Sequence, residues 1–252
     1  MNKIEIIFTG AVDEQSIDKI LKSYPDVEIK QFNLLKFSKV INNKNLKKYY
    51  DAASSSSIVC ITSKKTIEII KQYKDLIDIV SQKKIIVSGE KVASFLKKEI
   101  NAEVFFSKQL QGQNGVIDVL SKIATDKDSI LYLHSNKAEE KISRFLKSGK
   151  FTGHCKVVYE TDIDDLSSIE LLNYLNENND NNKVIFFASP SAVHAYQDKI
   201  LSSYEKKINY IAFGQSTKDV CETYKIDCFN DSGCKSYVDL ITQFLIEKLL
   251  IY

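Results

Sequence analysis

The chain has 252 residues, of which 44% are hydrophobic and 27% are charged, an ordinary composition for one large globular domain or two smaller ones. The formal net charge is only +2 and charges of both signs are interspersed, which argues against a nucleic-acid-binding or membrane-surface protein. No apolar run approaches the roughly 20 residues of a membrane helix, and the first residues lack signal-peptide anatomy, so we expect a cytoplasmic protein.

Short runs rich in β-branched and aromatic residues alternate with helical patterns along the chain. The expected strands are 3–8, 27–32, 57–61, 84–87, 103–105, 129–133, 155–161, 183–187, 208–212 and 227–229. The expected helices are 13–23, 64–79, 89–99, 113–124, 136–148, 167–178, 190–202, 215–224 and 236–249. This alternation predicts parallel sheets with right-handed crossovers. The SSSS run at 54–57 and the NENNDNN run at 176–182 lack a packing pattern and are expected to be surface loops.

The chain also repeats itself at a spacing close to half its length. Ile58–Ile70 reads IVCITSKKTIEII and Val184–Tyr196 reads VIFFASPSAVHAY, which aligns Ser63 with Ser189, 126 positions later. Two further pairs have a spacing of 125 positions at their matching residues. Lys83–Phe105 resembles Lys206–Phe229, with Gly89 matching Gly214, and Ile4–Leu21 resembles Ser129–Leu146, with Leu21 matching Leu146. Three matches at nearly one spacing predict two copies of one set of βα units. Two similar lobes form a cleft, and clefts of this kind are common sites for small ligands.

Small polar residues stand where each expected strand ends and the next helix begins. They include Thr62 and Ser63, Ser88 and Gly89, His134 and Ser135, Ser189 and Ser191, and Gly214 and Thr217. Pro190 fits the first position of its helix. Ligands of parallel sheets bind outside the carboxyl ends of the strands, and helix starts favour anions. The same residues also cap helices in α/β proteins that bind nothing there, so ligand binding and simple capping both stay open.

No residue pattern indicates a metal, a cofactor or a standard catalytic constellation. The chain has no Walker A lysine motif, no GxGxxG and no recognisable Ser-His-Asp order, and His134, His154 and His194 lack metal-ligand spacing. His134 stands at a strand end, where it could line the cleft, whereas His194 is expected on a helix face. The five cysteines are irregularly spaced without a CxxC pair, so we expect reduced structural thiols, with Cys60 in a core strand.

Several of these segments together resemble the uroporphyrinogen-III synthase family. The family's strand-then-SPSAV segment is similar to VIFFASPSAVHAY, and its Thr-Ser counterpart resembles IVCITSKKTIEII. Its late A-x-G-x-x-T segment is similar to YIAFGQSTKDVCETYKIDC, its earlier G-x-x-x-A-x-x-L segment resembles IIVSGEKVASFL, and its V-Y-x-T crossover resembles VVYET at Val157–Thr161. The resemblance spans almost the whole chain.

The resemblance implies two flavodoxin-like parallel-sheet lobes joined by a two-stranded β ladder. One lobe is expected to be discontinuous, with residues 1–33 and 162–252, and the other to hold residues 34–161, with the active-site cleft between them. This division agrees with the repeat if the leading βα unit of each copy packs with the remainder of the other copy.

The resemblance also implies an activity, the cyclisation of linear hydroxymethylbilane to uroporphyrinogen III with inversion of ring D. Loss of the terminal hydroxyl gives an azafulvenium cation, the substituted carbon of ring D attacks it to form a spiro intermediate, and fragmentation and re-closure invert the ring. The substrate is a linear tetrapyrrole with eight carboxylates, and no cofactor, nucleic acid or membrane is implied. We expect a monomer whose main task is to orient the substrate.

The resemblance assigns roles to individual residues. Tyr159 of VVYET is the candidate to protonate or orient the leaving hydroxyl, the alternative being an aromatic packing residue in a strand. The candidate substrate-binding residues are Thr62, Ser63, Gly89, Ser189, Ser191, Gly214 and Thr217. Four positions depart from the family pattern: Val92 replaces a frequent Thr, His134 and Ser135 stand where Arg-Gly is frequent, and Lys235 lies where Pro-Thr is frequent.

Two other functions remain open from the sequence. The lack of a strong catalytic constellation is compatible with a non-catalytic two-lobe binding or sensor domain for a small polyanionic ligand. A periplasmic binding protein is disfavoured by the missing export signal and the five cysteines.

Overall fold

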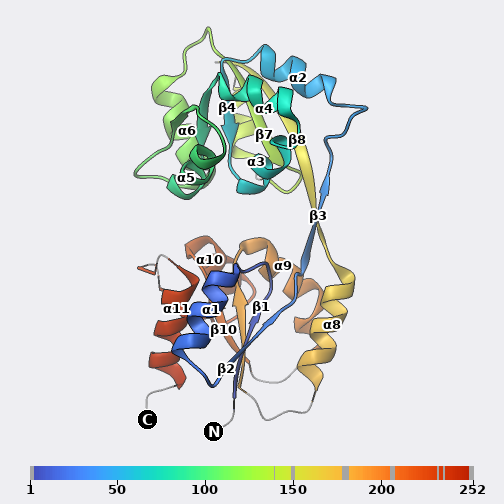
Figure 1. Ribbon diagram of the computed structural model, residues 1–252, viewed down its shortest axis with the longest axis vertical. Coiled ribbons are helices and arrows are strands. Elements are labelled where there is room, and N and C mark those ends of the chain that lie inside the picture. Colours follow the sequence, from blue (N-terminus) through green and yellow to red (C-terminus); the bar gives the residue numbers. More distant parts are fainter. Residues whose placement is uncertain are drawn as a thin grey trace. The chain divides into compact units, whose positions relative to one another are not determined.

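Figure 1 shows the computed structural model, in which the chain divides into two compact α/β units. The first unit holds Met1–Lys36 and Asp162–Tyr252, and the second holds Phe37–Thr161. The chain passes between them within β3 (Leu35–Lys39) and within β8 (Thr152–Ile163). The structure describes residues 3–138, 140–148, 151–177, 182–204, 208–231, 233–234 and 236–249.

The first unit contains a four-stranded parallel sheet in the order β10-β9-β1-β2. A single parallel bridge places Phe229 beside Ile211 at the β10 edge, which gives the strand order of flavodoxin-like sheets. Its elements are β1 (Ile4–Phe8), α1 (Glu14–Ser23), β2 (Val27–Gln31), α8 (Asp165–Asn176), β9 (Asn182–Phe187), α9 (Pro190–Lys199), the 3-10 turn Leu201–Ser203, β10 (Asn209–Ala212), α10 (Gln215–Thr223), α11 (Tyr237–Phe244) and the π-helical turn Leu245–Leu249.

Strand alternation divides the core of this unit between the two faces of the sheet. Ile6 and Phe8 of β1 pack on one face with residues of α1 and α11, whereas Ile7 packs on the other with residues of α8, α9 and α10. Both faces of β1 are therefore covered, and this explains why IEIIF is apolar at almost every position.

The second unit contains a sheet in the order β3-β8-β7-β4-β5-β6, in which β8 to β6 are parallel. Val59 and Ile61 of β4 pack with residues of α2, α3, α4 and α5, while Ile58 and Cys60 pack with residues of α6 and α7 on the other face. The remaining elements are α2 (Lys47–Ser54), β4 (Ile58–Ile61), α3 (Lys64–Ile70), α4 (Lys74–Ser81), β5 (Lys84–Val87), α5 (Glu90–Glu99), β6 (Glu103–Phe105), α6 (Gly112–Ile123), β7 (Ser129–Ser135) and α7 (Lys141–Lys147).

The strand pairings exchange elements between the two copies of the sequence repeat. β1, from the first copy, pairs with β9 from the second, and β7, from the second copy, pairs with β4 from the first. Each sheet thus takes its leading strands from one copy and the rest from the other. The parallel, flavodoxin-like α/β class predicted from the sequence is confirmed.

The strands β3 and β8 form a two-stranded antiparallel ladder. The Asp164 N–H donates to the Leu34 carbonyl at 2.9 Å, and the Val40 N–H donates to the Val158 carbonyl at 3.0 Å, so the partners run in opposite directions. β3 is missing from the sequence-based strands because four of its five residues are exposed and show no apolar alternation.

Several sequence-based boundaries are wrong. The expected helix 64–79 is two helices, α3 and α4, and the expected helix 136–148 is only the seven residues of α7. α2 was not expected, and the SSSS run is not simply a surface loop, because Ser54 ends α2 and Ser56 is buried with its hydroxyl donating to the Ala52 carbonyl. The expected strand 227–229 is reduced to the bridge at Phe229. Most of 176–182 lies outside the described residues.

Candidate functional site

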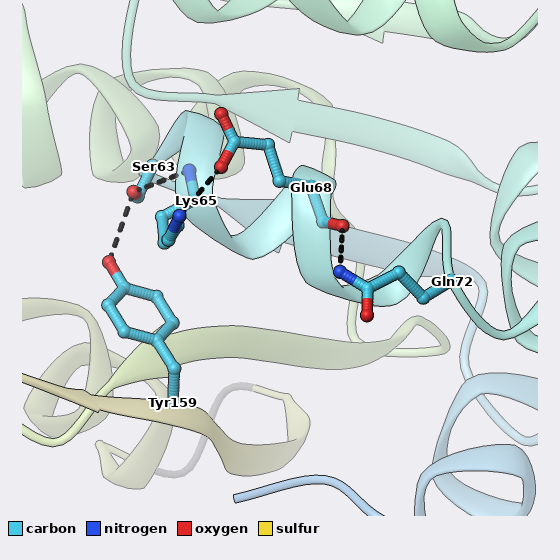
Figure 2. Close-up of polar contacts among 5 residues, drawn as sticks. All are labelled: Ser63, Lys65, Glu68, Gln72 and Tyr159. Carbon is cyan, nitrogen blue, oxygen red and sulfur yellow. Dashed lines mark hydrogen bonds and ion pairs between the residues drawn. The ribbon is translucent and has the colours of Figure 1, made fainter. Parts of the chain in front are cut away.

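The end of β4 in the second unit brings two predicted site residues into contact. Ser63 caps α3, and its hydroxyl oxygen accepts the N–H of Lys65 at 3.0 Å. The hydroxyl of Tyr159, on β8, donates to the same Ser63 oxygen at 3.1 Å (Figure 2). The predicted catalytic residue and a predicted substrate-binding residue therefore form one hydrogen-bonded pair.

The position of Tyr159 depends on an irregularity between β7 and β8. His134 pairs with Val157 and Ser135 pairs with Tyr159, so Val158 is an extra residue on the β8 side. Asn136 fixes the far side of this bulge, because its backbone N–H donates to the Tyr159 carbonyl at 3.1 Å and its side-chain oxygen accepts the Thr161 N–H at 2.9 Å. The backbone on both sides of Tyr159 is therefore anchored.

The ring of Tyr159 is buried, with 6% of the residue exposed, and it meets Phe37 edge-on at 6.0 Å between centroids. The ammonium group of Lys65 lies 5.3 Å from the centre of the Phe37 ring and pairs with Glu68 at 3.0 Å. Figure 2 shows Lys65 and Glu68 on the same helix as Ser63, which precedes them. Because both side chains of this ion pair are about 40% exposed, the pair adds little to stability.

Thr62 and Gly89 stand at the ends of the adjacent strands β4 and β5. The Thr62 hydroxyl is 3.4 Å from that of Tyr132, whose pKa burial raises to about 12, and the Thr62 carbonyl accepts the Ser88 hydroxyl at 2.9 Å. Gly89 caps α5 with an extended backbone, and a Cβ added there meets no heavy atom within 4 Å. The fold therefore does not require glycine at this position.

A basic pocket adjoins this edge of the second unit. It has a volume of about 360 Å³, and the Lys64 ammonium lies 5.6 Å from the centre of the Phe95 ring within it. Its lining comes from the first residue of α3 and from positions along α5: Lys64, Glu90, Lys91, Ser94, Phe95 and Lys98. Three lysines against one glutamate give the pocket a positive balance that suits carboxylates.

The first unit presents the other predicted residues at the ends of β9 and β10, which are paired neighbours. Ser189 caps α9 by accepting the Ala192 N–H at 3.3 Å, with Pro190 at the first helical position as predicted. Ser191 follows and is half-buried. Gly214 caps α10 with a φ of +85°, in the left-handed region that favours glycine.

Thr217 differs from the other predicted residues because it is buried, with 1% exposed. Its backbone N–H donates to the Gly214 carbonyl at 3.2 Å within the first turn of α10. A role for its hydroxyl in substrate binding therefore requires its neighbours to move, and that role stays a prediction.

The departures from the family pattern have local explanations. Val92 is half-buried and packs on the core of the second unit. His134 stacks on Tyr132 with ring centres 4.6 Å apart, and its Nδ1 lies 2.8 Å from the Ser135 carbonyl. Burial lowers the pKa of His134, so this residue does not replace the charge of an arginine at neutral pH. Lys235 lies outside the described residues.

Two residues of this site were not singled out from the sequence. Phe37, which contacts Tyr159, is 50% exposed within a polar segment, and this isolated aromatic residue is a weak signal. The spacing of Asn136 from Tyr159 carries no local sequence pattern. Among the described residues, no three His, Cys, Asp or Glu side chains form a group that could hold a metal, and none of the described helices is long and apolar enough to cross a membrane.

Comparisons with known proteins identify the family. The family model described as uroporphyrinogen-III synthase HemD matches residues 26–230, and no curated protein matches. A mutant uroporphyrinogen III synthase from the extremely thermophilic bacterium Thermus thermophilus has a similar structure, with a TM-score of 0.69 at 10% identity over 96% of this chain and 97% of that chain. The uroporphyrinogen-III synthetase of Helicobacter pylori gives 0.64 at 15% identity over 96% and 99%. At these identities the structural likeness shows the fold alone.

The match to the family model covers most of the chain and confirms the resemblance found in its motifs. It supports an enzyme of porphyrin and haem biosynthesis, a cyclising lyase that acts on hydroxymethylbilane, and it does not favour the non-catalytic binding domain. The chain therefore belongs to the uroporphyrinogen-III synthase family.

Proposed function

We propose that Tyr159 is the residue that assists loss of the terminal hydroxyl of hydroxymethylbilane, and that the chain then forms uroporphyrinogen III with ring D inverted. The observation that supports this role is the hydrogen bond from the Tyr159 hydroxyl to Ser63. The ring of this tyrosine is buried, and its hydroxyl contacts the polar residue Ser63 that follows β4. The oxygen of the substrate's leaving group is an acceptor of the same kind as the Ser63 oxygen.

The proposed step begins with the bond between the terminal carbon and its hydroxyl oxygen. As that bond breaks, the oxygen gains negative charge and accepts the hydrogen bond or the proton of Tyr159, leaving as water. The azafulvenium cation that remains is attacked by the substituted carbon of ring D. The spiro intermediate fragments and closes again, and loss of a proton restores the aromatic pyrrole.

The bilane can also close without a catalyst, to the type I isomer. The protein's contribution is therefore mainly to hold the linear bilane so that attack by the substituted carbon of ring D is favoured. We infer that the protein positions the substrate by binding its carboxylates, because they are the substrate's charged groups.

The candidate groups for binding carboxylates occur in both units. In the second unit they are Thr62, Ser63 and Gly89, next to the lysine-lined pocket. In the first unit they are Ser189, Ser191, Gly214 and Thr217, around the starts of α9 and α10. Helix N–H groups, hydroxyls and lysines all stabilise carboxylates, which supports carboxylate binding by each of these two sets of residues. The division into two lobes predicted from the sequence, residues 1–33 with 162–252 and residues 34–161, is also part of what we propose.

The role of Tyr159 is tested by Tyr159→Phe. We expect kcat to fall by about 10²-fold or more, as for loss of a general acid, and the free energy of unfolding to fall by only about 1 kcal/mol, as for loss of one hydrogen bond. Steady-state kinetics and denaturant unfolding measure the two effects.

Tyr73→Phe is a matched control, because Tyr73 in the same unit donates to the Ile41 carbonyl at 2.8 Å. It should lose similar stability and keep the wild-type kcat. If Tyr159→Phe and Tyr73→Phe have the same kcat, Tyr159 has no part in the reaction.

We also propose that the protein acts as a cytoplasmic monomer. All five cysteines are free, which fits a reducing compartment. Sedimentation of the purified chain at several concentrations tests the monomer, and a mass that rises with concentration would contradict it.

A further inference from the structure

The first unit contains a second chemical feature, a pair of thiols at the end of α10. Cys221 lies on the last turn of this helix and is fully buried, while Cys228 is half-buried in the segment that follows. The two thiols interact, and Cys228 packs against the hydrophobic core to which Cys221 belongs.

The turn between the two cysteines is fixed by its backbone. Lys225 has a φ of 58°, the one positive value at a non-glycine residue in the described part of the chain. This turn lets the Ile226 N–H donate to the Cys221 carbonyl at 2.9 Å and the Lys225 N–H donate to the Glu222 carbonyl at 3.0 Å. These two bonds form a Schellman motif, which directs the chain back across the helix end.

The next segment is held on the other side by β10. The Phe229 N–H donates to the Tyr210 carbonyl at 2.8 Å, and the Phe229 carbonyl accepts the Ala212 N–H at 2.9 Å. Cys228 therefore lies on a short segment that a helix-end motif and a strand bridge hold in place from its two ends.

The surroundings make the two sulfurs chemically different. Cys228 lines a surface pocket of about 300 Å³ together with Lys218 and Lys225, so a small solute can reach it. Interaction with the Cys221 thiol lowers the pKa of Cys228, and the Lys218 ammonium acts in the same direction, while burial, Asp227 and Glu222 oppose them. The same contact and burial raise the pKa of Cys221. Because Cys228 lines the pocket and Cys221 is fully buried, Cys228 is the sulfur that a solute reaches first, and Cys221 is the resolving thiol.

We propose that Cys221 and Cys228 form a redox-reactive dithiol that a small hydroperoxide oxidises to an intramolecular disulfide. The Cys228 thiolate attacks one peroxide oxygen, the O–O bond breaks, and the leaving hydroxide takes a proton to become water (or an alcohol, from an alkyl peroxide). The Cys221 sulfur then attacks the resulting sulfenic sulfur, and the S–O bond breaks. The leaving oxygen departs as a second water with the Cys221 proton. Two thiols lose two electrons, and the peroxide gains them.

Treatment of the full-length protein with equimolar hydrogen peroxide tests the proposal. We expect the intact mass to fall by two hydrogen atoms and the titratable thiols of the denatured protein to fall from five to three. Trypsin without reductant should then join 219–225, which contains Cys221, to 226–235. Because 226–235 contains both Cys228 and Cys234, the Cys234→Ser variant identifies the partner and should still form the disulfide.

Two further variants separate the roles of the cysteines. Cys228→Ser should lose the mass change, and Cys221→Ser should accumulate a sulfenic acid at Cys228 that dimedone captures. Cys155→Ser, which removes an exposed thiol on β8, is the matched control and should behave as wild type. A disulfide that persists in Cys228→Ser, or oxidation that adds oxygen to wild-type Cys228 without closing the disulfide, would overturn the proposal.

Discussion

The hydroxyls of Tyr159 and Ser63 are 3.1 Å apart although the residues are separated by 96 positions in the chain. Each residue was predicted separately, from a resemblance in its own motif. Their contact was not predictable, because it requires the pairing of β7 with both β4 and β8, and no local pattern encodes that order. The same holds for Phe37, which reaches Tyr159 from a segment that was not expected to be a strand.

The two predicted glycines of the site should respond differently to alanine. Gly214 has a φ of +85°, so Gly214→Ala should lower the free energy of unfolding by about 1 kcal/mol or more. Gly89 is extended with open space at Cβ, so Gly89→Ala should change stability by less than about 0.5 kcal/mol. Denaturant unfolding measures both effects.

Gly89→Ala should nevertheless raise the KM for hydroxymethylbilane several-fold, because the added methyl group occupies the space through which the substrate reaches the backbone. Steady-state kinetics on this stable variant provide the test. An unchanged KM would leave Gly89 as a helix cap without contact to substrate.

The lowered pKa of His134 predicts that the stability of the protein depends on pH. Burial lowers its pKa in the folded state, so the unfolded chain binds this proton first as the pH falls below about 6.5. The contribution of the neutral His134 ring to the free energy of unfolding is complete above that pH and is lost below it. Wild type should therefore lose more free energy of unfolding between about pH 7 and about pH 5 than His134→Gln, which has no titrating ring. Equal losses in the two proteins would show that His134 titrates as in the unfolded chain.

At the scale of elements, buried strands were predicted well and exposed ones poorly. The strands β4 and β5 are apolar because helices cover both of their faces, and the sequence shows this as short runs of Ile and Val. β3 has polar residues at most positions because it is exposed, and its partner β8 specifies it through backbone hydrogen bonds instead. The break between α3 and α4 was missed because both helices bury apolar residues at continuous helical spacing.

The β8 bulge should act on the reaction through Tyr159. Asn136→Ala removes the acceptor of the Thr161 N–H and loosens the backbone around Tyr159, so kcat should fall with a stability loss of about 1 kcal/mol. If the effect passes through Tyr159, the double variant with Tyr159→Phe should be no slower than Tyr159→Phe alone. Additive losses in kcat would show that Asn136 contributes by another route.

For the whole molecule, the repeat was visible in the sequence but the exchange of strands was not. The offset of about half the chain predicted two copies, and only the pairings of β1 with β9 and of β7 with β4 show how the copies share their sheets. Chain order alone is compatible with each copy folding by itself. The exchanged arrangement was expected only from the family resemblance.

The isomer ratio of the cyclised product is the most direct measurement of the central claim, that this fold directs a reaction which the substrate can also undergo unaided. Hydroxymethylbilane is incubated with the purified protein, and the products are oxidised to porphyrins and separated. We expect type III uroporphyrinogen to predominate, with the Tyr73→Phe control giving the same ratio as wild type. Type I product alone, formed at the rate seen without protein, would contradict both the activity and the site described for it.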